Sequence, residues 1–133
     1  MLKKIRFTFL IVTISYLIIV SVLSLITFST NSTISSFPHL DKIIHFVFYF
    51  GMNVLILSSI ILYRKQSNSR LFEYIIATII TVSYSGLIEY IQPLVGRAKD
   101  YSDLIANSLG AMTGLIIFIL LSHIYKDKIE HLR

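Results

Sequence analysis

The charged residues of this chain are gathered into a few clusters, and their distribution constrains the fold more than any other feature. Four stretches contain no Asp, Glu, Lys or Arg: residues 7–40, 43–63, 74–88 and 104–125. A hydrocarbon core about 30 Å thick needs roughly 20 apolar residues per spanning helix. Four such helices use most of the 133 residues and leave short loops. We therefore predict an all-α membrane protein, a four-transmembrane-helix bundle, with spans at about 7–28, 40–63, 71–92 and 101–125.

The composition agrees with this prediction and excludes several classes of function. Apolar residues make up 55% of the chain and charged residues 14%, whereas charged residues are about a quarter of a soluble domain. The chain has no cysteine, which rules out disulfides, thiolate metal sites, iron–sulfur clusters and a cysteine nucleophile. The net charge of +5 is explained by basic residues that flank membrane spans, so we expect no nucleic-acid partner.

The basic residues also predict how the spans are oriented. The N-terminus, the turn between the second and third spans and the C-terminal tail together hold nine Lys and Arg, and the other two loops hold three. Basic loops stay on the cytoplasmic side, so both termini are predicted to be cytoplasmic. The first apolar run is too long for a signal peptide and has no small-x-small cleavage site, so we expect it to remain as an anchor helix.

This topology brings costly polar residues to the outer side of the membrane. The second and fourth spans begin there and the third ends there, so the following side chains share one layer with the connecting loop: Asp41, Lys42, His45, Glu89, Gln92, Arg97, Asp100, Asp103 and Asn107. Residues three or four apart share a helix face, so each helix presents its polar residues together. The polar stripe of the fourth span continues into Gly110 and Gly114, a GxxxG pattern that permits close helix packing.

Glu89 is the most informative of these residues, because a charge in hydrocarbon costs several kcal/mol. It is separated from Glu73 by 15 uncharged residues, about 22 Å of helix at 1.5 Å per residue. Both glutamates therefore lie near the hydrocarbon boundary. We expect Glu89 to face protein or trapped water, with His45, Arg97 or a protonated carboxyl as its partner. Glu73 lies in a first helical turn, where the helix dipole favours an acid, and is interpreted as structural.

An ordered set of motifs resembles a known family. Asp41-Lys42-x-x-His45 opens one span, Gly86-x-x-Glu89-x-x-Gln92 closes the next, and Arg97, Asp100, Asp103, Asn107 and Gly110 follow. This set, over residues 38–121, is similar to the VanZ-like family of bacterial membrane proteins. The resemblance implies a single domain over residues 1–133 in the bacterial cytoplasmic (inner) membrane. The family takes its name from an accessory teicoplanin-resistance protein, and its membrane domain has been suspected of enzymatic work on envelope lipids or polymers.

The residues of the polar layer are suited to acid–base chemistry on an anionic substrate, if they form an active site. His45 and Glu89 are suited to acid–base catalysis, with Asp41 orienting the imidazole and Asp103 beside them. Arg97 offers a planar fork for phosphate or carboxylate. The remaining positions implied to bind substrate are Gln92, Asn107 and Lys42. We expect hydrolysis or transfer at a lipid head group or lipid-linked envelope precursor on the outer face. No cofactor is expected, since one histidine among carboxylates is a weak signal for a metal.

Other interpretations of the same residues remain open. Aspartates in first turns cap helices and face the helix dipole, and His45 with Glu89 can simply lock two spans together. Gln92, Asn107 and the mid-span Asn53 are typical interhelical hydrogen-bond partners, and Lys42 can snorkel to head groups. The alternative function is a non-catalytic membrane scaffold or a lipid- or antibiotic-binding module. A transporter ranks third, because few polar residues lie deeper in the membrane.

Overall fold

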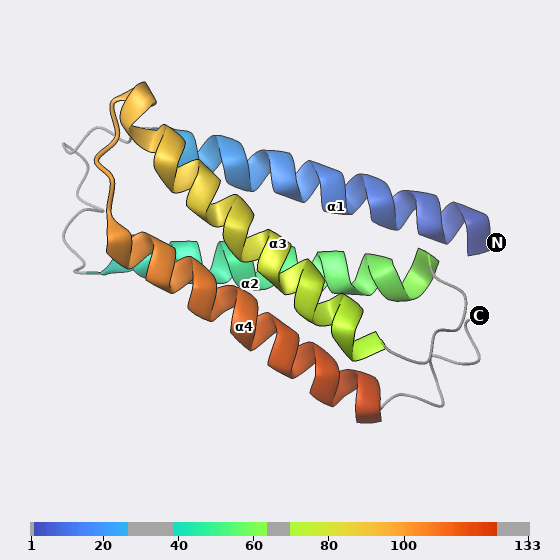
Figure 1. The fold of residues 1–133 in the computed structure, drawn as a ribbon. Helices are drawn as coiled ribbons and strands as arrows, with labels where there is room; N and C mark the ends of the chain where they lie inside the picture. Colours follow the sequence, from blue (N-terminus) through green and yellow to red (C-terminus); the bar gives the residue numbers. More distant parts are fainter. Residues whose placement is uncertain (1, 27–38, 64–69, 125–133) are drawn as a thin grey trace.

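The computed structural model describes residues 2–26, 39–63 and 70–124, which form four long helices running in alternating directions (Figure 1). The elements are α1 (Leu2–Leu25), α2 (Leu40–Tyr63), α3 (Arg70–Ile91), a short 3-10 helix η2 (Gln92–Val95) and α4 (Tyr101–Ile124). Each of the four α-helices is long and apolar enough to cross a membrane. The predicted class, an all-α four-helix membrane bundle, is confirmed. The start of α1 and the end of α4 lie at the same end of the bundle.

The helix boundaries differ from the predicted spans mainly at α1 and α3. Helix α1 begins at Leu2, before the predicted start at Phe7, because Lys and Arg are good helix formers and continue the helix beyond its apolar part. It ends at Leu25, and the predicted end at Phe28 lies outside the described residues. Helix α3 ends at Ile91, where η2 brings in Pro93, and Gly96 at φ 79° reverses the chain. This turn presents Arg97 to the end of the bundle.

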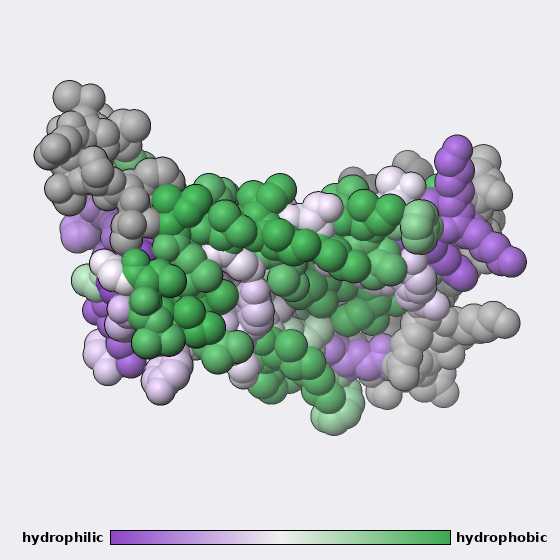
Figure 2. Space-filling model, turned by 90° about the horizontal axis from the view of Figure 1, so that it is seen from above, coloured by the Kyte–Doolittle hydropathy of each residue, from purple (hydrophilic) through white to green (hydrophobic). Residues whose placement is uncertain are grey.

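The outer surface of the bundle is apolar, and its interior is partly polar. Figure 2 shows a broad hydrophobic band between two ends where hydrophilic residues gather. The following polar side chains, by contrast, are at most 2% exposed: Ser24, Asn53, Thr81, Ser85, Gln92 and Asn107. Because lipid tails are as apolar as leucine, helices in a bilayer associate through close packing and hydrogen bonds. Hydrogen bonds in the polar interior, together with close packing, therefore hold this bundle together.

Asn53 joins three helices at the centre of the bundle. Its Nδ2 donates hydrogen bonds to Thr78 Oγ1 of α3 at 3.1 Å and to the carbonyl of Ala111 on α4 at 2.8 Å. Its Oδ1 accepts a bond from Thr81 Oγ1 at 3.2 Å. The interhelical role predicted for Asn53 is confirmed.

Helices α2 and α4 are in backbone contact along the GxxxG face. A methyl group added at Gly110 would overlap the carbonyl oxygen of Phe46, and one added at Gly114 would lie 3.1 Å from the carbonyl oxygen of Phe50. Glycine at these two positions therefore lets α2 and α4 lie closer together than any larger residue would allow. This contact directly follows His45 on α2 and lies one turn beyond Asn107 on α4, so it sets the distance between these two side chains.

Helix α1 packs against α2 and α3, and less closely than α4 does. Of its described side chains, those of Val20 and Ser24 alone are buried. Thr13 Oγ1 and Ser59 Oγ of α2 are hydrogen-bonded at 2.9 Å, and the Tyr16 hydroxyl donates to the carbonyl of Phe48 at 3.2 Å. A few polar contacts therefore position α1 along α2.

Candidate functional site at one end of the bundle

A cluster of polar side chains occupies the end of the bundle where α1 and α3 finish and α2 and α4 begin. Each helix contributes: Ser24 from α1, His45 from α2, Glu89 from α3, and Asp103 with Asn107 from α4. Arg97 reaches the cluster from the connection between α3 and α4. We call these residues, together with Asp41, Lys42, Gln92 and Asp100, the polar site. Its place at the helix ends puts it near the level of lipid head groups.

Lys42 holds one side of the polar site together. Its Nζ lies 2.8 Å from Asp41 Oδ2, 2.7 Å from Asp100 Oδ2 and 2.9 Å from Asp103 Oδ1. Asp103 is the buried member, with 4% of its side chain exposed, whereas Asp41 and Asp100 are about half exposed at 53% and 45%. Lys42 therefore joins the start of α2 to the start of α4, and its ammonium group is committed to carboxylates rather than to a lipid head group.

Asp100 also caps α4. Its Oδ1 accepts hydrogen bonds from the backbone N–H of Ser102 at 2.8 Å and from the Ser102 hydroxyl at 2.6 Å, which satisfies a backbone donor of the first turn. The hydrogen bond from Lys42 and those from Ser102 hold the pKa of Asp100 well below its usual range. The capping interpretation of Asp100 is therefore confirmed, in addition to its ion pair.

The imidazole of His45 is buried and fixed by residues of α4. Its Nδ1 lies 3.0 Å from Asn107 Oδ1, so this ring nitrogen carries the hydrogen. Its Nε2 lies 3.5 Å from Asp103 Oδ2 and 3.3 Å from Arg97 Nη2. Because a guanidinium can only donate, Nε2 presents its lone pair. Asn107, rather than the predicted Asp41, orients the ring, since Asp41 is drawn to Lys42.

Arg97 is anchored to the last turn of α1. Its Nη1 donates to the carbonyl of Ser24 at 2.7 Å, and Gln92 Nε2 donates to the same oxygen at 3.1 Å. The guanidinium therefore spans from α1 to the imidazole of His45 on α2. This arrangement fixes the plane of the guanidinium and leaves the side chain partly buried.

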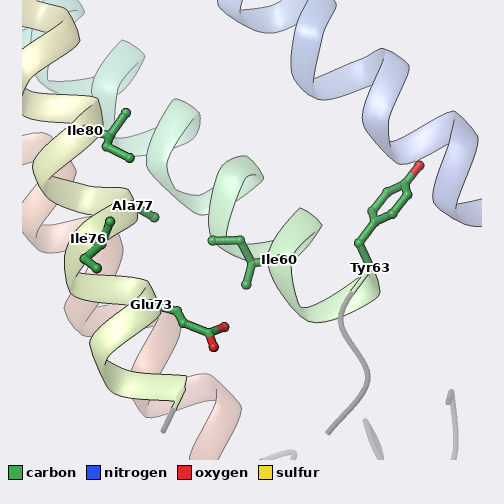
Figure 3. A pocket seen from close by; sticks show the side chains of 6 residues that line it. All are labelled: Ile60, Tyr63, Glu73, Ile76, Ala77 and Ile80. Atoms are coloured by element: carbon green, nitrogen blue, oxygen red, sulfur yellow. The ribbon is translucent and has the colours of Figure 1, made fainter. Parts of the chain in front are cut away.

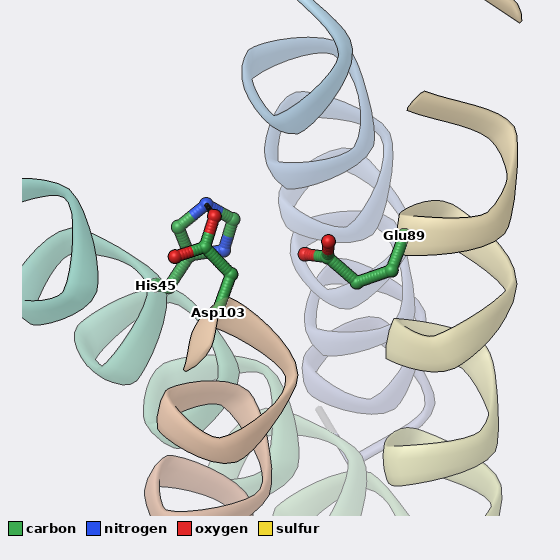
Figure 4. Close-up of side chains that lie close together, drawn as sticks. All are labelled: His45, Glu89 and Asp103. Carbon is green, nitrogen blue, oxygen red and sulfur yellow. Dashed lines mark ion pairs between the residues drawn. The ribbon is translucent and has the colours of Figure 1, made fainter. Parts of the chain in front are cut away.

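Glu89 has no hydrogen-bond partner among the described residues. The residue is 3% exposed, and neither of its carboxylate oxygens accepts a hydrogen bond from the described part of the chain. Figure 4 shows its carboxylate extending from α3 toward His45 and Asp103. One ligand atom from each of these three residues lies within 4.8 Å of the other two. Glu89 thus faces protein, as predicted, and it lies close to His45, one of the partners predicted for it, without a hydrogen bond.

The polar site brings together all eight residues predicted to act in catalysis or substrate binding, in two connected parts. His45, Glu89, Asp103, Asn107 and Arg97 form a buried part, with Gln92 joined to Arg97 through the Ser24 carbonyl. Lys42, Asp41 and Asp100 form a more exposed part that meets the first at Asp103. The buried part offers a neutral imidazole, two carboxylates and a guanidinium, which are groups that exchange protons, bind anions or hold a cation.

Two residues were not predicted: Ser24, a member of the polar site, and Tyr49, which lies next to it on α2. The Ser24 carbonyl binds Arg97 and Gln92, and no sequence signal marks it because every residue has such a group. Tyr49 lies one turn after His45 on α2 and is fully buried, and its hydroxyl has no hydrogen-bond partner among the described residues. Asp41, His45 and Tyr49 are four residues apart and therefore share one helix face. This spacing could have predicted from the sequence that Tyr49 lies beside His45.

A pocket of about 400 Å³ lies at the other end of the bundle (Figure 3). It is lined by Ile60, Tyr63, Glu73, Ile76, Ala77 and Ile80. Its lining is almost entirely apolar, and Glu73 is its single charged residue. It lacks the convergent polar groups of a chemical site, so the polar site remains the candidate.

Comparison with known proteins shows the family to which the chain belongs. The family model VanZ/LLP1 matches residues 4–122, nearly the whole chain and all residues of the polar site. No curated protein and no solved structure matches the chain. The match extends through all four helices, and it includes α1, which the motifs in the sequence did not cover. The chain therefore belongs to the VanZ-like family.

Proposed function

We propose that the chain acts on the head group of an anionic lipid or lipid-linked cell-envelope precursor, by hydrolysis or transfer, at the outer face of the bacterial cytoplasmic membrane. The observation that carries the proposal is the Glu89 carboxylate, buried beside His45 and Asp103 with no hydrogen bond to any described residue. A buried carboxylate is costly in a membrane helix. A structural role would provide it with partners, whereas a role in binding or chemistry requires it to be free.

The position of Arg97 supports an anionic, amphiphilic substrate. Its guanidinium lies at the end of the bundle, near head-group level, and directly beside His45 Nε2. Guanidinium binds phosphate and carboxylate through two parallel hydrogen bonds. A lipid phosphate bound by Arg97 would therefore lie next to the imidazole, with its acyl or prenyl chains in the bilayer.

The reaction that suits this geometry uses His45 as base and Glu89 as acid. Arg97 Nη2 first turns from His45 Nε2 to the bound phosphate or carboxylate, which frees the Nε2 lone pair. His45 Nε2 then accepts a proton from water as the water oxygen bonds to the phosphorus or carbonyl carbon of the substrate. The bond from that atom to the leaving oxygen breaks, and protonated Glu89 gives its proton to the leaving oxygen. In a transfer reaction, the hydroxyl of a second substrate replaces water. Asn107 keeps the imidazole in the required tautomer by accepting from Nδ1.

The outward orientation is part of the proposal. It is supported by the excess of basic residues in the N-terminus, the turn between α2 and α3 and the C-terminal tail, which the positive-inside rule assigns to the cytoplasm. Single cysteines introduced at Ser35 and Ser67 test it in intact cells with a membrane-impermeant thiol reagent. Labelling at Ser35 alone is expected, and labelling at Ser67 alone would move the polar site to the cytoplasmic face.

The activity is tested with purified protein in lipid nanodiscs and labelled envelope lipids. The wild-type protein is expected to release or transfer a head group, and Glu89→Gln and His45→Gln are expected to abolish turnover. Glu73→Gln is the matched control, because it makes the same change on the same helix at the opposite end. Loss of substrate binding in Glu89→Gln, with no turnover by the wild type, would instead favour the non-catalytic binding module.

A link to teicoplanin resistance is a separate test of the same proposal. The wild-type chain, expressed in a susceptible bacterium, is expected to raise the inhibitory concentration of teicoplanin, and Glu89→Gln is expected to abolish the increase. Immunoblotting of the membrane fraction controls for equal amounts of the two proteins. An equal increase with both would separate resistance from the chemistry of the polar site.

A further inference from the structure

We propose that His45, Glu89 and Asp103 form a binding site for a divalent transition-metal cation, with Zn²⁺ as the ion that suits it best. The inference goes beyond the proposed reaction, because it concerns an ion whose binding is measured with no lipid substrate present. It rests on the geometry of three side chains from three different helices, all buried and at most 3% exposed.

The separations of the ligand atoms suit a small cation. Zinc binds histidine nitrogen and carboxylate oxygen at about 2.0–2.2 Å, so two ligands of a tetrahedral site lie roughly 3.4 Å apart. His45 Nε2 and Asp103 Oδ2 are 3.5 Å apart, close to this value. The Glu89 atom lies within 4.8 Å of the other two. A shift of roughly 1 Å in its side chain would complete a site with three protein ligands and one open position.

The surroundings prepare His45 and Asp103 to act as ligands. Metal-binding histidines usually donate their second ring N–H to a carbonyl or carboxylate, which fixes the tautomer. His45 Nδ1 donates in this way to Asn107 Oδ1 and leaves the Nε2 lone pair facing Asp103. Asp103 is prepared likewise, because Lys42 holds Oδ1 at 2.9 Å while Oδ2 faces His45. His45 and Asp103 therefore each present one ligand atom to the site, while Asn107 and Lys42 hold their other polar atoms.

Glu89 provides the independent observation. It is 3% exposed, both of its oxygens lack a hydrogen bond to any residue that the structure describes, and its carboxylate points at the other two ligands (Figure 4). Charge balance points the same way. With Glu89 protonated, as the proposed reaction requires, the polar site holds three carboxylates (Asp41, Asp100 and Asp103) against the two cationic side chains Lys42 and Arg97, and it carries one excess negative charge when His45 is neutral. Glu89 adds a second negative charge when it loses its proton to bind a metal. A divalent cation would neutralise this excess.

A second group with ligand spacing, Asp41, Asp100 and Asp103, is not proposed as a metal site. The Lys42 ammonium lies within 2.9 Å of one oxygen of each of these carboxylates and already acts as their cation. The His45 group has no such internal cation. Two cations lie at its edge: Lys42 binds Asp103 Oδ1, the oxygen that does not face His45, and Arg97 Nη2 donates to the His45 Nε2 lone pair at 3.3 Å. A metal bound to Nε2 must displace this contact, so Arg97 and the cation compete.

The cation would also change what the site residues do. A metal on His45 Nε2 and Glu89 occupies the atoms that would otherwise exchange protons. The acid and base roles proposed above therefore belong to the metal-free protein. In the metal-bound protein, Arg97 is released from His45 and remains anchored through Ser24, where it can bind an anion beside the cation.

The test is a zinc titration of the full chain in nanodiscs after removal of metals with a chelator. Equilibrium dialysis with elemental analysis measures zinc per chain, and thermal unfolding measures its effect on stability. We expect one tightly bound zinc per chain and a higher unfolding midpoint when zinc is present. Co²⁺ is expected to give the visible absorption bands of a site of low symmetry. Mg²⁺, which prefers six oxygen ligands including several waters, is expected to bind far more weakly.

Glu89→Gln is the decisive variant, because the carboxylate makes no hydrogen bond in the described structure that the amide would break. The metal-free variant should be about as stable as the wild type, since the amide replaces a buried carboxyl group that has no hydrogen-bond partner among the described residues, and zinc should no longer raise its unfolding midpoint. Asn107→Ala, which removes the support of the ligand His45, should weaken binding by about 10- to 100-fold. Arg97→Gln should strengthen binding, because it removes the competing guanidinium.

Glu73→Gln is the matched control and should bind zinc as the wild type does. The exposed His39 and His123 provide a weak background that Glu89→Gln retains. Equal zinc binding by the wild type and Glu89→Gln, or no saturable binding by the wild type, would overturn the inference. Zinc binding without lipid turnover would leave this inference standing and refute the proposed reaction, and turnover without zinc binding would do the reverse.

Discussion

Replacement of Gly110 by alanine is expected to separate α2 from α4 and weaken the whole bundle. An added methyl group would overlap the carbonyl oxygen of Phe46 and lie 3.0 Å from its carbonyl carbon and 3.1 Å from the backbone nitrogen of Phe50. All three obstacles are backbone atoms of a helix, which cannot rotate aside as a side chain can. Relief therefore requires the two helices to move apart by roughly 1 Å, since interiors are close-packed.

The expected magnitude follows from two opposing effects. Overpacking of a well-packed interior costs about 1–3 kcal/mol, and the rigid obstacle favours the upper end of this range. Alanine is preferred to glycine inside a helix by about 1 kcal/mol, which offsets part of the loss. We expect Gly110→Ala to lower the free energy of unfolding by about 2 kcal/mol. Because His45 and Asn107 flank this contact, their hydrogen bond should lengthen as well.

Reversible unfolding in mixed micelles or nanodiscs measures this change, and Gly86→Ala is the matched control. Gly86 lies in the C-terminal half of α3, and the nearest atom to an added methyl group, Leu104 Cδ1, is 3.9 Å away. Gly86→Ala should therefore stabilise the protein by up to about 1 kcal/mol through helix propensity alone. Gly114→Ala should fall between the two, because its methyl group would meet the Phe50 carbonyl oxygen at 3.1 Å.

The reasoning is refuted if Gly110→Ala and Gly86→Ala change stability equally. It is also refuted if Gly110→Ala destabilises the protein while zinc binding and lipid turnover stay unchanged. In that case, the contact between α2 and α4 would not set the geometry of the polar site.

Three further predictions concern polar residues. Asn53→Leu removes hydrogen bonds to two helices and should cost about 1–2 kcal/mol; unchanged unfolding would show that these bonds contribute nothing. Lys42→Met leaves the buried Asp103 without its cation and should cost about 3 kcal/mol, the lower end of the range for breaking a buried pair. Asp41→Asn, at a side chain 53% exposed, should cost under about 1 kcal/mol. Because the pKa of Asp100 is lowered on folding, its ion pair stabilises the protein above about pH 4 and is lost at lower pH. When the free energy of unfolding is measured against pH, Asp100→Asn should therefore lose less stability below about pH 4 than the wild type does. An equal loss in both proteins would contradict this.

The architecture followed from charge spacing because the bilayer imposes a length on every helix. Four uncharged stretches required four spans, and alternation of direction then placed Asp41, Glu89 and Asp103 at the same end, although they lie far apart in the chain. The helix start at Leu2 was missed because the hydrophobic signal ends where the lysines begin, while the helical backbone continues through them.

The contacts within the polar site did not follow from the sequence. Spacing along a helix shows which residues share a face, but it does not show how far each helix is rotated toward its neighbours. Asp41 shares a face with His45, yet Asn107 holds the ring, because the glycine contact brings α4 close to α2 at this level. The Arg97 anchor could not be predicted either, since its acceptor is the backbone carbonyl of Ser24.

Helix α1 packs loosely, yet it contributes to the polar site through the hydrogen bond between Arg97 and the Ser24 carbonyl. Each residue along a helix turns the chain by about 100° and advances it by 1.5 Å. A single insertion or deletion in the first helix would therefore swing this carbonyl away from the guanidinium and leave Arg97 and Gln92 without their shared acceptor. Any change that rotates α1 about its axis relative to the other helices would therefore disturb Arg97 and Gln92, even where the hydrophobic length of α1 is preserved.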